Sequence, residues 1–335
     1  MTTTSNISVV MAVRNAAPTL EKACHSLLAQ TLLPKEILLI LNGCNDQTPQ
    51  IATALQQTHS QIRILNSPPE GGVALAARLG CQEAQSPLLA RMDADDVAHP
   101  QKLEHQVAKL IETNADLVTS HIKTENSLGA GLERFVHWAN TLHLPQDFLH
   151  QRFIESPVIQ PGVLMTKKAY SAVGGYQVQE GPEDYDLWLR LLENKARFFQ
   201  APNAILHWHD SPTRLTRSHS DYSEARMTAT KAQYLARLEQ VQNHGVVLAG
   251  TGPIGRRLGK FLQQQNITLK AFFDVAPQKI GKTCLGLPIL GPQDFGVAHR
   301  QAILLGCVGR GKREQVRKLA QEIGYQEGLD FFACC

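Results

Sequence analysis

The strongest constraint on the fold is a regular alternation of strand-like and helix-like segments over the first ~120 residues. Ile7–Val13 is a short, apolar, β-branched run that predicts a buried strand, and Pro18 then opens an amphipathic helix to about Gln30. Glu36–Leu41 predicts a second strand, which ends at the Asn42-Gly43 turn signal. The same alternation of strands and helices continues, with further strands predicted at 62–65, 88–92 and 117–120. It predicts an α/β fold with a mainly parallel sheet flanked by helices.

Three residues mark where the intervening helices are expected to begin. Thr48-Pro49 reads as an N-cap followed by proline at the first helical position, and Pro100 starts a later helix. Gly72 opens the helix between the third and fourth strands. Near residue 241 the pattern restarts with strand, glycine turn and helix, so we expect domains at 1–240 and 241–335.

An acidic cluster, Asp93-Ala94-Asp95-Asp96, follows the fourth strand without a gap. Ligands of open α/β sheets bind outside the carboxyl ends of the strands. Two carboxylates there predict a hard-oxygen site for Mg²⁺ or Mn²⁺, which takes its other ligands from water and substrate phosphates. The alternative is an ordinary helix cap or a solvated turn.

Two further groups are candidates for chemistry. Glu183-Asp184 opens an amphipathic helix, where the positive end of the helix dipole favours an ionised carboxylate. His207 and His209 lie two residues apart on a strand-like stretch and therefore share a face. Surface or core roles are the alternatives for all four residues.

The C-terminal part carries Gly250-x-Gly252-x-x-Gly255 between an apolar strand and a helix, with Asp274 about 20 residues further on. This is the context of a dinucleotide fingerprint, in which glycines let the backbone approach a phosphate and the acid binds a ribose. The module spans only about 90 residues, shorter than the usual two-half dinucleotide fold. A nucleotide, a nucleotide sugar, a dinucleotide or a purely packing role all stay open.

Composition narrows the class of protein. The 335 residues are 43% hydrophobic and 19% charged, as expected for a globular chain of about two domains. The seven cysteines show no CxxC spacing, which argues against a zinc site or a disulfide framework. Without a membrane-length apolar run or a signal peptide, we expect a cytoplasmic protein. From Gly245 onward there are 12 basic and 6 acidic side chains, against 21 and 24 before it, so peripheral contact with the inner membrane face is an alternative.

Several motifs together resemble the family 2 glycosyltransferases, which have the GT-A fold. The matching stretches are ISVVMAVRNAAPTLEKACHSLLAQT, EILLILNGCNDQT, EGGVALAARLG, LLARMDADDVAHPQKL, SPVIQPGVLMTKKAYSAVGGY, GPEDYDLWLRL and HWHDSPTRLT. They follow the family's order over about two-thirds of the chain. The resemblance implies a metal-dependent, inverting transfer of a sugar from a nucleoside-diphosphate donor. The donor it implies is a UDP-sugar. The acceptor is implied to be a hydroxyl of a glycan or of a lipid-linked glycan, in polysaccharide biosynthesis.

The resemblance also implies roles for individual residues. Asp184 corresponds to the catalytic base, Asp95 to the main metal ligand, and His209 to a second ligand. Asp93 corresponds to the residue that touches the ribose. The remaining correspondences are donor-side Ala12, Arg14, Asn42, Asp46, Arg78 and Ala94, and acceptor-side Gln160, Glu183 and Trp188. A core role is the alternative for Trp188. The family usually has two aspartates where this chain has Leu41 and Asn42, which leaves the nucleotide base open.

The C-terminal segment FFDVAPQKIGKTCLGLPILGPQDF resembles the small Rossmann-like domain that precedes nucleotide-sugar acyltransferases. That resemblance implies a nucleotide-binding module, with Gly250, Gly252, Gly255 and Asp274 at the ligand. Two alternatives remain from the sequence: a catalytically silent GT-A protein that binds nucleotide sugars, and an NAD(P)-linked oxidoreductase centred on this module.

Overall fold

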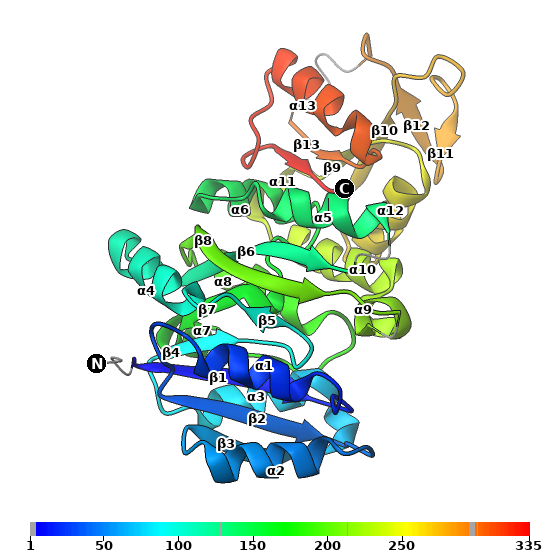
Figure 1. The fold of residues 1–335 in the computed structure, drawn as a ribbon. Coiled ribbons are helices and arrows are strands. Elements are labelled where there is room, and N and C mark those ends of the chain that lie inside the picture. Colours follow the sequence, from blue (N-terminus) through cyan, green and yellow to red (C-terminus); the bar gives the residue numbers. More distant parts are fainter. Residues whose placement is uncertain (1–4, 127–128, 213, 295–298, 300) are drawn as a thin grey trace. The chain divides into compact units, whose positions relative to one another are not determined.

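The strand-like runs of the sequence assemble into two separate sheets, each within its own unit of the chain (Figure 1). The structure is a computed structural model and describes residues 5–126, 129–212, 214–294, 299 and 301–335. The first unit comprises Met1–Phe148 and Pro157–Ser218, and the second comprises Leu149–Ser156 and His219–Cys335. Thr213 and Phe295, which belong to two of the quoted motifs, lie outside the described residues.

The sheet of the first unit has eight strands in the order β3-β2-β1-β4-β7-β6-β8-β5. Neighbours within β3-β2-β1-β4 run parallel, β6 and β8 run parallel, and β7 and β5 are antiparallel to their neighbours. The sheet is therefore mixed but mainly parallel. Its strands are β1 (Ile7–Val13), β2 (Glu36–Asn42), β3 (Ile62–Ser67), β4 (Leu88–Arg91), β5 (Val97–Ala98), β6 (Leu117–Glu125), β7 (Val163–Thr166) and β8 (Phe198–His209).

Helices cover both faces of this sheet, as alternate residues of the buried strands require. Val9 and Met11 of β1 face one core cluster, while Val10 faces the other. The first cluster includes residues of α1 (Leu20–Leu28), α2 (Thr48–Thr58), α4 (Lys102–Thr113) and α5 (Ala130–Ala139). The second includes residues of α3 (Gly72–Glu83), α7 (Lys167–Ala172) and α8 (Glu183–Glu193). The short helix α9 (Leu215–Ser218) ends the unit, and α6 (Pro145–Gln151) spans a boundary between the two units.

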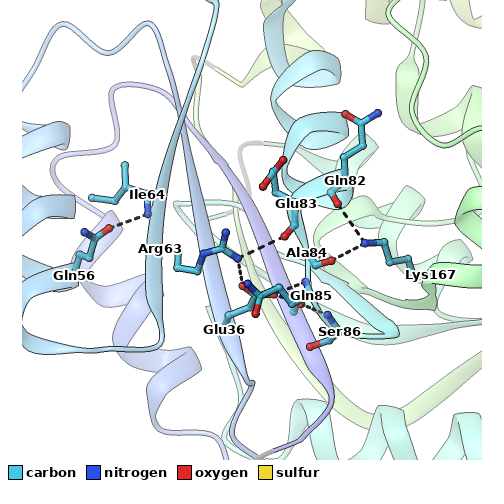
Figure 2. Close-up of polar contacts among 11 residues, drawn as sticks. Glu36, Gln56, Arg63, Ile64, Gln82, Glu83, Ala84, Gln85, Ser86 and Lys167 are labelled. Carbon is cyan, nitrogen blue, oxygen red and sulfur yellow. Dashed lines mark hydrogen bonds and ion pairs between the residues drawn. The ribbon is translucent and has the colours of Figure 1, made fainter.

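A polar cluster fastens the amino ends of the first strands (Figure 2). Glu36, at the start of β2, accepts hydrogen bonds from the Ser8 hydroxyl and the Gln85 amide, both at 2.6 Å, and forms an ion pair with Arg63 of β3. Burial raises the pKa of this carboxyl, but these hydrogen bonds outweigh burial and lower it overall. Lys167 donates to the carbonyls of Gln82 and Ala84 beside this cluster. The carboxylate is therefore fully engaged within the fold.

The second unit has a smaller sheet in the order β11-β12-β10-β9-β13-β14, parallel except for the β11–β12 pair. Its strands are β9 (Val246–Ala249), β10 (Leu269–Phe273), β11 (Thr283–Cys284), β12 (Leu287–Leu290), β13 (Ile303–Gly306) and β14 (Phe331–Ala333). Its helices are α10 (Glu224–Leu235), α11 (Glu239–His244), α12 (Pro253–Gln264) and α13 (Arg313–Glu322). The expected restart near Val241 falls in α11, just before β9. Within the described residues, no helix combines the length and apolarity needed to cross a membrane.

Two helix starts differ from the expectation. Thr48 is not the N-cap of α2 but its first residue, because the Thr48 hydroxyl accepts the Ala16 amide at 2.8 Å and Asp46 accepts the Thr48 amide at 3.0 Å. The helix expected from Pro100 starts two residues later, at Lys102. At Thr48 a tertiary hydrogen bond takes the hydroxyl that local capping would use.

Candidate active site

The carboxyl ends of β2, β1 and β4 lie side by side at one edge of the first sheet, since these three strands are parallel neighbours. The turn after β2 is held from within: the Asn42 amide nitrogen donates to Pro68 O at 2.8 Å, and the Asp46 carboxylate accepts the amides of Ala17 and Thr48. Hydrogen bonds from Thr48 lower the pKa of Asp46. Asp46 therefore shapes the turn, and Asn42 keeps its side-chain oxygen as an acceptor.

The acidic turn after β4 presents two carboxylates and buries a third. Asp93 and Asp95 are partly exposed, whereas Asp96 is 1% exposed. Asp96 Oδ1 accepts the His209 backbone amide at 2.9 Å, and β5 pairs with β8 directly beside it. Asp96 thus ties the acidic turn to the end of β8, more than 100 residues away in the sequence.

The acidic turn is a crowded, partly buried cluster of carboxylates, with the cations Arg91, Arg214 and Lys102 acting on Asp93. Burial raises the pKa of Asp93, helped by the charge of Asp95, while the guanidinium of Arg91 opposes the rise. Burial and the same two neighbouring aspartates raise the pKa of Asp96 well above its usual value. Three carboxylates this close disfavour one another's ionised forms. A cation bound at the turn would relieve this repulsion, because it attracts each of them.

Two cations near the turn were not anticipated from the sequence. Lys102 is fully buried at the start of α4, and burial lowers its pKa to about 8. Arg214 stacks on the Trp208 ring at 3.7 Å and lies 3.7 Å from the buried Asp210, and its charge acts on Asp93, Asp95 and Asp96. Both belong to quoted stretches, Lys102 to LLARMDADDVAHPQKL and Arg214 to HWHDSPTRLT, but neither was assigned a role.

The two histidines of β8 lie on one face of the strand, as predicted, because the buried Leu206 and Trp208 alternate with them. His207 Nδ1 lies 2.9 Å from Glu125 Oε1, so this imidazole is engaged away from the acidic turn. His209 is held beside the turn through its backbone. Among the described residues, no three His, Cys, Asp or Glu side chains form a ready-made metal cage.

The second acidic pair lies at the start of α8. Asp184 is partly exposed, and Glu183 is 5% exposed, with its carboxylate 3.4 Å from Gln160 Nε2. Burial, followed by the charge of Glu183, raises the pKa of Asp184 to about 8. The expectation that the helix terminus alone keeps Asp184 ionised is therefore wrong for the unliganded chain, since desolvation outweighs the dipole. The charge of Asp93 also raises this pKa, which places the two acidic groups in one electrostatic neighbourhood.

The other sequence-predicted residues divide into surface and core. Trp188 has no exposed surface, so it is a core residue and not an acceptor contact, a correction of the sequence-based assignment. Gln160 is 8% exposed, and its amide is used inside the protein. Arg14 is exposed, Ala12 and Arg78 are partly buried, and Ala94 is 8% exposed within the acidic turn.

Packing within the second unit explains two of the three glycines in its glycine turn. A Cβ on Gly250 would lie 2.4 Å from Cys307 O, and one on Gly255 would lie 2.1 Å from Gly250 O, so the fold itself requires both glycines. Gly252 alone leaves open space, at the N-cap of α12. Asp274 Oδ2 is paired with Lys279 Nζ at 2.7 Å and with the Thr251 hydroxyl at 2.6 Å.

Comparison with known proteins finds a family whose model matches just under half of the chain. Residues 8–171 match the model of glycosyl transferase family 2. Glycosyltransferase AglE of Haloferax volcanii is 30% identical over 138 residues, which cover 40% of this chain and 45% of AglE. The O-antigen biosynthesis glycosyltransferase WbnJ of Escherichia coli is 26% identical over 190 residues, covering 56% of this chain and 71% of WbnJ.

The fold has solved counterparts as well. The crystal structure of residues 1–349 of S. aureus TarS in complex with UDP superposes with a TM-score of 0.54 at 16% identity, over 77% of this chain and 71% of that one. At that identity the likeness concerns the fold, which is GT-A. Residues 8–171, just under half of the chain, therefore resemble a glycosyl transferase family 2 domain.

Proposed function

We propose that this chain transfers a sugar from a nucleoside-diphosphate donor, a UDP-sugar, to a hydroxyl of a growing glycan, with inversion at the anomeric carbon. The observation that carries the proposal is the acidic turn: Asp93 and Asp95 are partly exposed at a strand's carboxyl end, and the charge of Asp93 acts on Asp184. The family of the domain supports the reaction class. The glycan acceptor follows relatives such as WbnJ, named for O-antigen biosynthesis.

The donor set suits a hard divalent cation. Mg²⁺ in phosphate-handling sites is usually held by one or two carboxylates, with phosphate oxygens and waters completing the shell. Asp95 and His209 are the protein ligands we propose, with Asp93 directed to the ribose. Bound there, Mn²⁺ or Mg²⁺ would supply Lewis-acid stabilisation of the negative charge on the leaving diphosphate. Arg214, whose charge acts on the acidic turn, is the side-chain cation that we propose to contact the same phosphates.

The base of the nucleotide is proposed to bind at the turn after β2. The Asn42 amide nitrogen is already engaged by Pro68 O, so its oxygen is left to accept a hydrogen bond. A uracil ring offers an imide N–H that such an oxygen can accept. This supports uridine at a position where the usual carboxylate is missing.

The transfer itself is a single displacement. The acceptor oxygen forms a bond to the anomeric carbon as the bond from that carbon to the diphosphate oxygen breaks, and the nucleoside diphosphate leaves. Asp184 takes the proton of the attacking hydroxyl through its carboxylate oxygen. Its raised pKa makes it a stronger base than an ordinary aspartate, which matches this role.

For the second unit, we propose a site for a nucleotide phosphate at Gly252, where the turn is open. Ribose binding by Asp274 would have to displace Lys279 and Thr251, so we propose that a phosphate at Gly252 binds without a contact between Asp274 and a ribose. Titration of the intact protein with UDP and with NADH, read out on an Asp95→Asn background, tests whether either nucleotide binds there.

The test of the main proposal is the Asp184→Asn variant. General-base catalysis contributes about 10²–10⁴-fold, so we expect transfer to fall by about 10³-fold while the dissociation constant for UDP changes less than about threefold. The matched control is Asp186→Asn, two residues along α8, whose carboxylate is instead paired with Arg190 at 2.7 Å. The control is expected to lose stability but to retain turnover. Wild-type rates in the Asp184 variant would disprove the assignment of the base.

A further inference from the structure

A chain of buried polar groups runs beneath the candidate active site, from the acidic turn to the start of α8. Arg91 Nη2 lies 3.8 Å from Asp93 Oδ1 and 3.5 Å from Gln160 Oε1. Gln160 Nε2 then lies 3.2 Å from the Tyr176 hydroxyl and 3.4 Å from Glu183 Oε1. These contacts link the two acidic motifs through side chains that sequence reasoning had either omitted or assigned elsewhere.

Arg91 is an unusual residue to place in the interior of a sheet. It is the last residue of β4 and has no exposed surface, although the guanidinium is charged at every physiological pH. It donates to Val10 O of the neighbouring strand β1, and its guanidinium lies 6.0 Å from the centre of the Tyr176 ring. Burial of a charge costs several kcal/mol unless it is paired, and the carboxylate that pairs with it is Asp93.

Gln160 connects this cation to the second acidic pair because its amide has two different ends. The amide oxygen accepts from Arg91, and the amide nitrogen donates toward Tyr176 and Glu183. Among uncharged side chains of this length, only glutamine both accepts and donates in this way. At 8% exposure and with both ends used, Gln160 has little left to offer an acceptor sugar directly.

The partners of Gln160 are themselves fixed. Tyr176 has no exposed surface and packs against Tyr170 with ring centres 5.7 Å apart, while the Tyr170 hydroxyl accepts the Tyr176 amide. Glu183 is the first residue of α8, so its position also sets that of Asp184. The 3.4–3.8 Å contacts are individually long, and their effect is to fix geometry.

We propose that Arg91 and Gln160 are positioning residues that form a buried bridge, which sets the donor-side aspartate Asp93 and the base Asp184 at a fixed separation. This inference rests on the proposed function. A displacement reaction needs the attacking oxygen, the anomeric carbon and the base aligned, and a misplacement of about 1 Å costs about 100-fold in rate. The bridge provides this alignment before any ligand binds.

The first experiment separates positioning from stability. Gln160→Leu removes the bridge, and Gln30→Leu is the control: Gln30 is 2% exposed, belongs to the same unit, and bonds to the carbonyls of Ser26 and His99. We expect both variants to lower the melting temperature, but only Gln160→Leu to lower kcat by about 10–100-fold, with the donor KM within about threefold of wild type. Equal losses of kcat at equal losses of melting temperature would overturn the positioning role.

The second experiment is an exchange across the bridge. Gln160→Glu places two carboxylates together, and Glu183→Gln removes the acceptor of the amide hydrogen, so each is expected to lower both kcat and the melting temperature. The double variant restores one donor and one acceptor in reverse order. We expect its melting temperature and kcat to exceed those of the worse single variant, with kcat recovering by about fivefold or more.

The two proposals fail in distinguishable ways. Strictly additive effects of the exchange on melting temperature and kcat would overturn the bridge, whatever the substrate. Wild-type protein that neither transfers sugar nor hydrolyses any nucleotide sugar in the presence of Mn²⁺ would overturn the proposed function. In that case the melting temperatures of the same four proteins still decide whether the bridge exists.

Discussion

Two acidic turns in this molecule follow parallel strands in the same way and yet end in opposite electrostatic states. After β4, Asp93, Asp95 and Asp96 crowd together, and burial and mutual repulsion raise the pKa of Asp93 and Asp96. After β10, burial likewise disfavours the charged form of Asp274, but bonds from Lys279 and Thr251 lower its pKa to about 2. In the first turn Asp93 lies 3.8 Å from Arg91, but no ion pair among the described residues involves Asp95, whereas Asp274 in the second turn is paired with Lys279.

This contrast shows that the position of an acid at a strand end does not identify a ligand site by itself. The useful quantity is the charge that the protein leaves unpaired. The acidic turn of the first unit gains free energy when a cation binds, while a ligand at Asp274 must first break an ion pair. We therefore expect the same substitution to have very different consequences in the two turns.

The largest expected effect is the loss of turnover in Asp95→Asn. Removal of a metal-binding carboxylate is expected to lower transfer by about 10³-fold or more and to abolish Mn²⁺-dependent thermal stabilisation, because the Lewis-acid contribution is worth several kcal/mol. Asp274→Asn is the matched variant of the second turn and is expected to leave turnover within twofold. A comparable loss of turnover in both variants would contradict the proposed difference between the two turns.

The next effect is a pH dependence set by Asp184. A base with a pKa of about 8 must be deprotonated to act, so kcat/KM should rise about tenfold per pH unit below pH 8 and level off above it. Rates of sugar transfer from pH 5.5 to 9 measure this profile, and Asp186→Asn should reproduce it. A profile that is already flat at pH 6 would show that Asp184 is ionised there, or that it is not the base.

The smallest expected effect concerns Glu36, which lies at the amino ends of the strands and, like Asp274, is satisfied within its unit. Because its pKa is lowered in the folded state, its contribution to stability is present above about pH 4.5 and is lost as the pH falls through the folded value. Glu36→Gln should cost about 2 kcal/mol of unfolding free energy at pH 7, and much less at pH 3. Urea denaturation at both pH values measures the difference, and turnover should be unchanged.

Much of the first sheet could be predicted from local pattern. Ile7–Val13 is the strand that the sequence indicates, and Glu36, Ile62, Leu88 and Leu117 begin strands where they were expected. The helix starts were less predictable: a tertiary hydrogen bond takes the Thr48 hydroxyl that local capping would use, and the helix expected from Pro100 begins at Lys102. The strand from Leu117 was expected to end at Ser120 but continues to Glu125, beside β8.

The sequence predicted only part of the candidate site. The partly exposed carboxylates of the acidic turn and of α8 follow recognisable motifs. Arg91 and Lys102 lie in the same quoted stretch as the acidic turn, but their burial was not predicted, since a buried arginine or lysine looks like a surface one in a sequence. Trp188 shows the reverse error: an aromatic residue near a motif was assigned to a ligand, but its ring fills the core.

The amino-acid pattern alone predicts the alternation of strands and helices, the positions of the acidic and glycine turns, and the resemblance of residues 8–171 to glycosyl transferase family 2. These depend on the period of apolar residues and on short motifs, which are local properties of a chain. Which carboxylates gain a cationic partner depends on the tertiary structure, because the partners are distant in the sequence or carry no distinguishing local pattern. Lys279 and Thr251 neutralise Asp274, whereas Arg91 lies beneath Asp93 and reaches Glu183 through Gln160.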